Sequence, residues 1–281
     1  MNSRMITDER IDDFKDHLFE NEKSEATIEK YVRDVCAFQR FSMGEEITKE
    51  KVIEYKNYLS DEGYAATSIN SMIGAINSFM VFMEWNDCRV RYLKVQRQIF
   101  RPAEKELTKS EYQKLCITAE RQGNIRLSMI LQTICSTGIR VSELKYITCE
   151  AVEMGETTVS LKGKTRRIII SRELRKKLLK YIKDEGIKDG YVFRTRTGKM
   201  IGRTNIWREM KKLCGKAGVD SSKVFPHNLR HLFARVFYSM EKDIVKLADV
   251  LGHCSIDTTR IYIVSTGIEH RKRIERMKLV I

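Results

Sequence analysis

The sequence predicts a mainly α-helical protein of two domains, with a small antiparallel β-hairpin or three-stranded sheet in the second domain. Three observations support this fold class. The chain has 281 residues, enough for two domains with separate cores. Apolar residues recur at helical spacing over most of its length. The pattern changes only once, between residues 151 and 171, to β-rich runs about a glycine-containing turn.

Residues 1–96 are expected to form a helical first domain. Its second helix carries the clearest apolar stripe, formed by Ile28, Tyr31, Val32, Val35 and Phe38. A third helix from Val52 to Leu59 follows Thr48, which is a typical N-cap residue. A fourth helix is predicted from about Ala66 to Trp85.

Residues 97–106 are expected to be a linker, since they follow a basic stretch and contain Pro102, one of only two prolines. Thr108 and Glu111 then form a capping box before an apolar run, which marks the start of the second domain, residues 107–281.

The change of period in the second domain predicts its sheet. Two β-rich runs, 157–161 and 166–170, flank a turn and should pair as a hairpin, and 151–154 is a candidate third strand. Helices are expected near 171–185, 203–217, 226–239 and 243–251.

The charge of the chain points to a polyanionic partner. The formal net charge is +14. Residues 1–100 hold 14 basic and 18 acidic side chains, whereas residues 101–281 hold 38 and 20, so the polyanion should bind mainly to the second part. No apolar run approaches the ~20 residues of a membrane span, and the N-terminus lacks a signal peptide's apolar stretch. Seven cysteines without a CxxC pair argue against a zinc site or a disulfide framework, so we expect a cytoplasmic protein.

Two short segments offer cations to a phosphate. In TGIRVSEL (137–144), Gly138 should end a helix and Arg140 should begin the next, where a guanidinium can meet a phosphate beside free backbone N–H groups. Lys162 and Lys164 flank the glycine of the hairpin turn. Taken singly, each of these cations is better explained as a solvated surface charge.

Two further segments carry histidines, an arginine and a tyrosine. In PHNLRH (226–231), a proline at the first helical position puts His227 and Arg230 three residues apart on one face, so both can reach one small anion. In LGH (251–253), His253 follows a glycine, and Tyr262 lies nine residues later. A capping role for His253 and a packing role for Tyr262 are the alternatives.

In this order and at these spacings, the four segments resemble the tyrosine site-specific recombinases, the family of phage integrases and Xer-type resolvases. The first domain resembles that family's SAM-like core-binding domain, so the likeness covers nearly the whole chain. It implies a DNA recombinase that acts through a 3′-phosphotyrosyl intermediate and a Holliday junction, in integration or excision of a mobile element or in resolution of DNA multimers. Such chemistry needs no metal, no other cofactor and no small-molecule substrate.

The resemblance implies that Tyr262 attacks the scissile phosphate. Free tyrosine has a pKa near ~10 and is a poor nucleophile at neutral pH, so it needs cations and a base nearby. Arg140 and Arg230 would bind the non-bridging oxygens and stabilise the charge that develops at phosphorus.

The resemblance also implies roles in proton transfer. His227 would assist transfer from the phenol, and His253 would form a hydrogen bond with a phosphate oxygen. Lys162 would be the general acid for the departing 5′-oxygen, a contribution of order 10²–10⁴ in rate. Lys164 is the alternative to Lys162 within the same turn.

Further polar residues are expected to contact DNA. Because the first domain is net acidic, its DNA face should be confined to the start of its fourth helix and the basic segment that follows. In the second domain, the helix from 203 could lie along a groove, with a solvated amphipathic helix as an equal alternative. The expected contacts are Thr67, Ser68, Ser71, Arg89, Arg91, Lys94, Arg97, Arg203, Asn205 and Arg208.

The expected assembly is a homo-tetramer on paired sites of double-stranded DNA, alone or with a second recombinase. The tail 263–281 is expected to be an exchange tail that docks on a neighbouring subunit, with packing on its own subunit as the alternative. Other functions left open are a type IB topoisomerase-like nicking-closing enzyme, a telomere resolvase and a catalytically inactive DNA-binding regulator. We expect no additional N-terminal arm-site domain.

Overall fold

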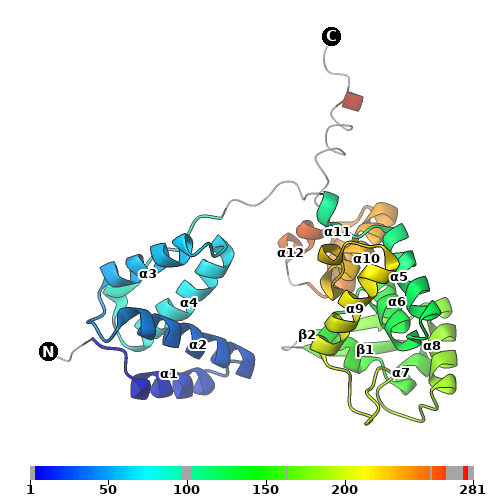
Figure 1. Ribbon diagram of the computed structural model, residues 1–281, viewed down its shortest axis with the longest axis horizontal. Helices are drawn as coiled ribbons and strands as arrows, with labels where there is room; N and C mark the ends of the chain where they lie inside the picture. The colour runs from blue at the N-terminus through cyan, green and yellow to red at the C-terminus, as the bar shows by residue number, and fades with distance from the viewer. Residues whose placement is uncertain (1–3, 96–102, 162–163, 254, 264–274, 278–281) are drawn as a thin grey trace. The chain divides into compact units, whose positions relative to one another are not determined.

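The computed structural model describes residues 4–95, 103–161, 164–253, 255–263 and 275–277. The chain divides into two compact units, Met1–Arg97 and Gln98–Ile281, each of which is described by itself. Within these described ranges the chain is mainly helical, and its one sheet has two antiparallel strands (Figure 1). The predicted fold class is confirmed.

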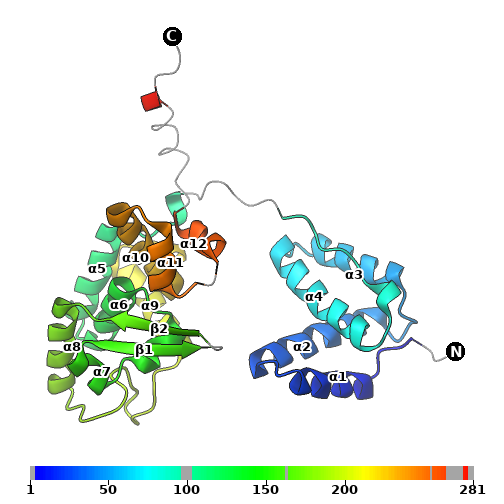
Figure 2. The ribbon, with the colours of Figure 1, turned by 180° about the vertical axis from the view of Figure 1, so that it is seen from behind.

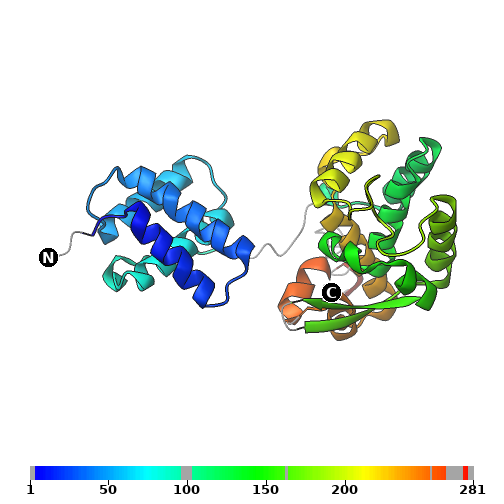
Figure 3. The same ribbon diagram turned by 90° about the horizontal axis from the view of Figure 1, so that it is seen from below.

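The described part of the first unit is a bundle of α1 (Asp8–Glu20), α2 (Glu25–Ser42), α3 (Lys49–Asp61) and α4 (Ala66–Phe82), followed by a short 3₁₀ turn, η1 (Asn86–Cys88). The predicted N-cap is present, because the Thr48 hydroxyl accepts from the Lys51 N–H. α1 and α2 lie side by side (Figure 3), and Phe14, Phe38 and Phe79 are fully buried between the helices.

The segment after η1 runs back along α4. Asn77 exchanges two hydrogen bonds with the Val90 backbone, at 3.0 and 3.1 Å, and Asn70 does the same with Leu93, at 2.9 and 2.7 Å. The two asparagines are seven residues apart and therefore lie on one face of α4. They bring the basic segment back to the first turns of that helix.

The second unit is larger and contains the sheet (Figure 1). The predicted capping box is present at Thr108 and Glu111, and the four helices expected after the hairpin are confirmed. Its described elements are η2 (Ala103–Lys105), α5 (Lys109–Arg121), α6 (Ile125–Thr137), η3 (Val141–Tyr146), α7 (Cys149–Met154), β1 (Glu156–Leu161), β2 (Lys164–Ile169), α8 (Arg172–Asp184), α9 (Arg203–Ala217), η4 (Ser221–Lys223), α10 (Pro226–Glu241), α11 (Ile244–Leu251) and α12 (Ile256–Ile263).

The candidate third strand at 151–154 is wrong, because this segment belongs to helix α7. The Thr148 hydroxyl accepts from the Ala151 N–H at the start of α7, and Gly155 ends the helix at φ +82°. β1 and β2 pair with each other, from Glu156 opposite Ile169 to Leu161 opposite Lys164.

The hairpin lies against the C-terminal helices of the second unit. β2 contacts α11 directly, and Figure 2 shows α11 and α12 on the β2 side of the hairpin. One face of the hairpin joins the core through Val159 and Ile168. This arrangement brings β2 close to the residues that connect α11 and α12.

The last residues of the predicted linker pack on α10. The Asn228 side chain donates to the Lys105 carbonyl at 3.0 Å, and Arg235 forms an ion pair with Glu106. Residues 96–102 lie outside the described part of the chain. In the described ranges, every helix is too short or too polar to cross a membrane.

Candidate active site

A tight turn after α6 presents the first arginine. Gly138 ends α6 at φ +64°, and a Cβ there would lie 2.5 Å from Cδ1 of Phe233. Only glycine fits both the left-handed backbone and the close approach of that ring. Arg140 follows as the N-cap of η3, and its side chain is 41% exposed. The expected places of both residues are confirmed.

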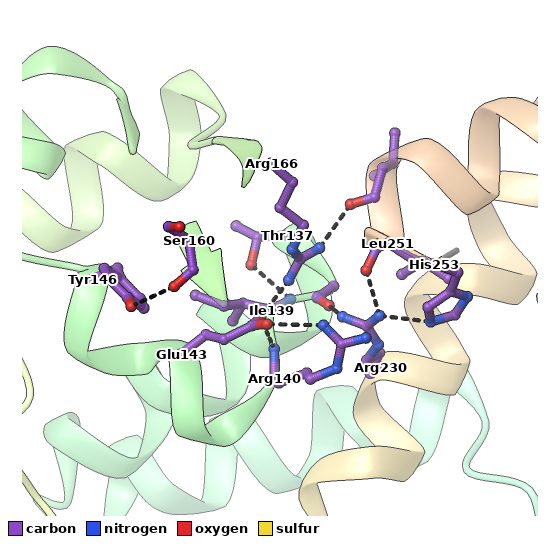
Figure 4. Close-up of polar contacts among 12 residues, drawn as sticks. Thr137, Ile139, Arg140, Glu143, Tyr146, Ser160, Arg166, Arg230, Leu251 and His253 are labelled. Atoms are coloured by element: carbon purple, nitrogen blue, oxygen red, sulfur yellow. Dashed lines mark hydrogen bonds and ion pairs between the residues drawn. The ribbon is translucent and has the colours of Figure 1, made fainter. Parts of the chain in front are cut away.

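Two hydrogen bonds to the Glu143 carboxylate fix the position of Arg140. Its Oε1 accepts from the Arg140 guanidinium at 2.8 Å, and its Oε2 accepts from the Arg140 backbone N–H at 2.9 Å (Figure 4). Its Oε2 also pairs with Arg166 of β2. Because the Glu143 side chain is only 1% exposed, the carboxylate is a fixed, buried counter-charge shared by two arginines.

The charges in this group shift one another's pKa. Burial by itself would raise the pKa of Glu143, but hydrogen bonds from Arg140 and the charge of Arg166 outweigh it, so the pKa is lowered. Burial lowers the pKa of Arg166, and Glu143 opposes that effect. The carboxylate is therefore ionised at neutral pH.

The second arginine, Arg230, lies on α10 and is 1% exposed. Its guanidinium donates to the Gly138 carbonyl and, at 2.7 Å, to the Leu251 carbonyl (Figure 4). Its Nε is buried and has no hydrogen-bond partner among the described residues. Burial, together with the charge of Arg140, lowers its pKa to about 10, so it is still a cation at neutral pH.

His253 lies beside Arg230 after a glycine that has little room. Gly252 adopts φ +64°, and a Cβ there would collide with Cδ of Arg166. The His253 ring lies with Nε2 at 2.9 Å from the Arg230 guanidinium and Nδ1 at 2.8 Å from the Thr259 hydroxyl. Burial and then the charges of Arg230 and Arg140 lower the pKa of His253 to about 4.

Tyr262, on α12, is buried among three histidine rings and is 4% exposed. Its ring centroid lies 4.2 Å from that of His231, 5.4 Å from that of His253 and 5.6 Å from that of His227. Hydrogen bonding with Tyr262 also acts to raise the pKa of Arg230, against burial. The phenol therefore lies within the cluster of cations and imidazoles.

An open cleft of about 740 Å³ lies in front of this cluster. Arg140, His227 and Arg230 line it, together with Arg203 and Trp207 from the first turns of α9. A cleft with three cationic or imidazole groups on its wall is suited to a phosphate.

The sequence-predicted site residues fall into three groups. Arg140, His227, Arg230, His253 and Tyr262 are brought together in one unit. Lys162 lies outside the described residues, as do Arg97 and most of the tail 263–281. The remaining candidates for DNA contact are all exposed: Thr67, Ser68, Ser71, Arg89, Arg91, Lys94, Arg203, Asn205 and Arg208.

Two of the exposed sets can be placed more closely. Thr67, Ser68 and Ser71 lie at the start of α4, where Asn70 also fixes the basic segment, and Lys30 of α2 donates to the Ser71 carbonyl at 2.7 Å. On α9, Arg203 lines the cleft, whereas Asn205 and Arg208 are not among the residues that line it.

Sequence reasoning missed Glu143, Arg166 and His231. Two of them had a signal, because Glu143 lies three residues after Arg140, and His231 lies four after His227 on the same helical face. Arg166 gave none, since its contacts depend on how the hairpin packs. In the described ranges, no group of three or more His, Cys, Asp or Glu side chains is arranged to hold a metal ion.

A helical unit followed by an α+β unit, in which a buried tyrosine packs beside histidines and a buried arginine next to a cationic cleft, is the architecture of enzymes that break and rejoin DNA through tyrosine. The comparisons with known proteins agree. The model of the phage integrase family matches residues 105–267, and that of the phage integrase N-terminal SAM-like domain matches residues 11–87. The chain belongs to the phage integrase family.

A relative supports the same assignment, and two solved structures share the fold. Tyrosine recombinase XerA of Pyrococcus horikoshii is 30% identical over 284 residues, which cover 98% of this chain and 96% of the relative. The structure of the Tn1549 transposon integrase with transposon right-end DNA has a TM-score of 0.73 at 16% identity, covering 95% and 98% of the two chains. That of a lambda integrase tetramer on a Holliday junction has a TM-score of 0.75 at 19% identity, covering 93% and 78%. The predicted reaction class is confirmed: the protein is a tyrosine-type site-specific recombinase.

Proposed function

We propose that this recombinase cuts DNA with Tyr262 as its nucleophile, in the cleft between η3, α9 and α10. One observation carries the proposal. Arg230 is a buried cation with which no carboxylate of the described residues pairs, and its buried Nε donor has no partner there. An unpaired buried charge is costly, so the site is built to receive an anion. The buried phenol of Tyr262 lies beside it.

The proposed step transfers the phosphoryl group of the scissile phosphate from the 5′-oxygen to Tyr262. Oη of Tyr262 bonds to phosphorus while the bond from phosphorus to the 5′-oxygen breaks. The phenolic proton passes to His227, and the 5′-oxygen takes a proton from Lys162. The products are a 3′-phosphotyrosyl ester and a free 5′-hydroxyl. A 5′-hydroxyl from another strand can reverse the step, which gives strand exchange without a metal or nucleotide.

The two arginines would bind different parts of the phosphate. Arg230 is fixed by two carbonyl oxygens, and its Nε is a donor without a partner among the described residues. Arg140 is half exposed on the cleft wall. Together they would stabilise the extra negative charge as phosphorus becomes five-coordinate, and because the protein already holds them in place, no reorganisation is needed at that moment.

His253 would join the site only after a change of partner. In the described state its Nε2 faces a guanidinium, which has only donors, so Nδ1 carries the proton and donates to Thr259. The negative charge of a bound phosphate would offset the charges of Arg230 and Arg140 and favour protonation of Nε2. His253 could then donate to a phosphate oxygen.

Duplex DNA and a tetramer are the proposed partners. The lambda integrase with this fold is a tetramer on a Holliday junction, and the Tn1549 integrase holds transposon-end DNA. By analogy, four copies of this chain would pair two sites, with residues 263–281 of each copy docked on a neighbour. If deletion of residues 266–281 leaves tetramer formation on DNA unchanged, the docking role of the tail is excluded.

A nicked suicide duplex that carries the target site tests the chemistry. The wild type should form a denaturant-stable protein–DNA adduct without magnesium, and Tyr262→Phe should bind the duplex but form none. Tyr238→Phe is the matched control, since Tyr238 packs in the same apolar cluster as Tyr262 and should retain the adduct. Adducts that persist in Tyr262→Phe would show that the nucleophile is another residue.

A further inference from the structure

Arg166 is a buried arginine of β2 that no sequence motif singles out. Its side chain is 8% exposed. One terminal nitrogen pairs with Oε2 of Glu143, and the other donates to the Val250 carbonyl at 2.7 Å (Figure 4). A single guanidinium therefore joins the hairpin to η3 and to the end of α11.

The contact with Glu143 determines how that carboxylate meets Arg140. Oε1 binds the Arg140 guanidinium, and Oε2 binds both the Arg140 N–H and Arg166. Without Arg166, the full charge of the carboxylate would act on Arg140 alone and its orientation would be less constrained. Arg166 thus divides the charge of Glu143 and leaves the Arg140 guanidinium free to face an anion in the cleft.

The contact with Val250 reaches the other side of the site. The next carbonyl, that of Leu251, accepts from Arg230, and Gly252 has no Cβ where the aliphatic part of Arg166 lies. Arg166 therefore contacts the carboxylate that holds Arg140 and the carbonyl that precedes the one holding Arg230.

Stability alone does not explain this placement. Burying an arginine beside a carboxylate stabilises a fold little more than an apolar side chain of the same volume would, and the Nε of Arg166 has no partner in the described residues. Its neighbour Arg167 is 69% exposed and lies 3.7 Å from Glu156, on the opposite face of the strand.

We propose that Arg166 is a positioning residue, which orients Arg140 for phosphate binding by holding Glu143 and touches no substrate itself. The inference rests on the proposed function, because it assumes that Arg140 stabilises negative charge on the scissile phosphate. It predicts that the loss of Arg166 slows the reaction more on a charged phosphate than on a neutral analogue.

The test compares two nicked duplexes in adduct formation. One carries the ordinary scissile phosphate, and the other carries a methylphosphonate, whose neutral group has lost one charged oxygen and needs less cationic help. Arg166→Gln should slow the reaction by up to about 100-fold on the phosphate, because misplacing an active-site group by about 1 Å can cost about 10²-fold, and much less on the methylphosphonate. Arg167→Gln is the matched control and should react as the wild type does on both.

A double-mutant cycle asks whether the effect passes through Glu143. The variant Glu143→Gln/Arg166→Gln should be no slower than Glu143→Gln, because the two residues act in series. If Arg166→Gln fails to fold, Arg166→Lys replaces it, since a lysine keeps the charge but cannot bridge Glu143 and Val250 together. It should show the same preference for the neutral substrate.

The outcomes separate this inference from the proposed function. Equal slowing of both substrates by Arg166→Gln or Arg166→Lys, no slowing, or additive effects in the cycle would overturn the positioning role. Arg140→Ala tests the assumption beneath it. If that variant shows no preference for the neutral substrate, Arg140 does not stabilise the phosphate charge and its role in the proposed function is wrong.

Discussion

The Arg230 guanidinium and Nε2 of His253 lie 2.9 Å apart. Because a guanidinium can only donate, this contact requires a neutral imidazole with its proton on Nδ1, where the Thr259 hydroxyl is 2.8 Å away. The lowered pKa of His253, about 4, has the same origin, since burial and the neighbouring cations both oppose protonation. The site is therefore suited to bind an anion, whose charge would offset the neighbouring cations and ease the protonation of His253.

This contact predicts that acid destabilises the second unit. The folded pKa of His253, about 4, is below its ordinary value of 6.5, so between these values the unfolded chain binds a proton that the folded chain does not. The free energy of unfolding should fall as the pH drops through this window and level off below about 4.

Urea unfolding from pH 4 to pH 7 measures the effect. His253→Gln, which cannot titrate, should show a flatter dependence than the wild type over the same range. Identical slopes in the two proteins would exclude His253 as the group responsible.

The clustering of the candidate catalytic residues was predictable because they lie in short local patterns. Pro226 starts α10 and so fixes the face on which His227 and Arg230 lie, and Gly138 fixes the turn that presents Arg140. These relationships are set within one or two helical turns, and the structure retains them.

One of the missed residues depends on a contact between segments distant in the sequence, and the false third strand reflects a competing local signal. The contact of Arg166 with Glu143 spans 23 residues and depends on the packing of β2, which no periodicity encodes. The false third strand arose because 151–154 was interpreted by its position beside the hairpin, although Thr148 and Gly155 flank it as helix start and stop signals.

A second prediction concerns the glycine that ends α6. Gly138→Ala should destabilise the second unit by more than the ~1 kcal/mol that a left-handed alanine costs, because the new Cβ also meets the Phe233 ring. Gly218→Ala is the control, since Gly218 has φ +62° and nothing within 4 Å of its added Cβ. Thermal unfolding of both variants measures the difference. Equal losses would mean that the ring moves aside without cost.

A third prediction concerns α9. Arg203 lines the cleft, so Arg203→Ala should weaken DNA binding and lower the slope of log affinity against log salt by about 1, the value for one lost phosphate contact. Lys180→Ala, on the exposed surface of α8, is the control of equal charge change and should leave the slope unaltered. Salt titrations of binding to the target duplex provide the measurement. An unchanged slope in Arg203→Ala would place this residue away from the phosphates.

The last prediction distinguishes the two lysines of the hairpin turn. A general acid is needed only when the leaving group is a poor one, and a 5′-bridging phosphorothiolate provides a thiolate that leaves with little protonation. Lys162→Ala should therefore lose adduct formation on the ordinary phosphate, by about 10²–10⁴, and recover most of it on the phosphorothiolate. Lys164→Ala should behave like the wild type on both substrates. Arg140→Ala should remain slow on both, because a better leaving group does not replace a missing cation. If Lys164→Ala rather than Lys162→Ala recovers on the phosphorothiolate, Lys164 is the general acid. If neither variant recovers, the proton comes from a group outside the hairpin.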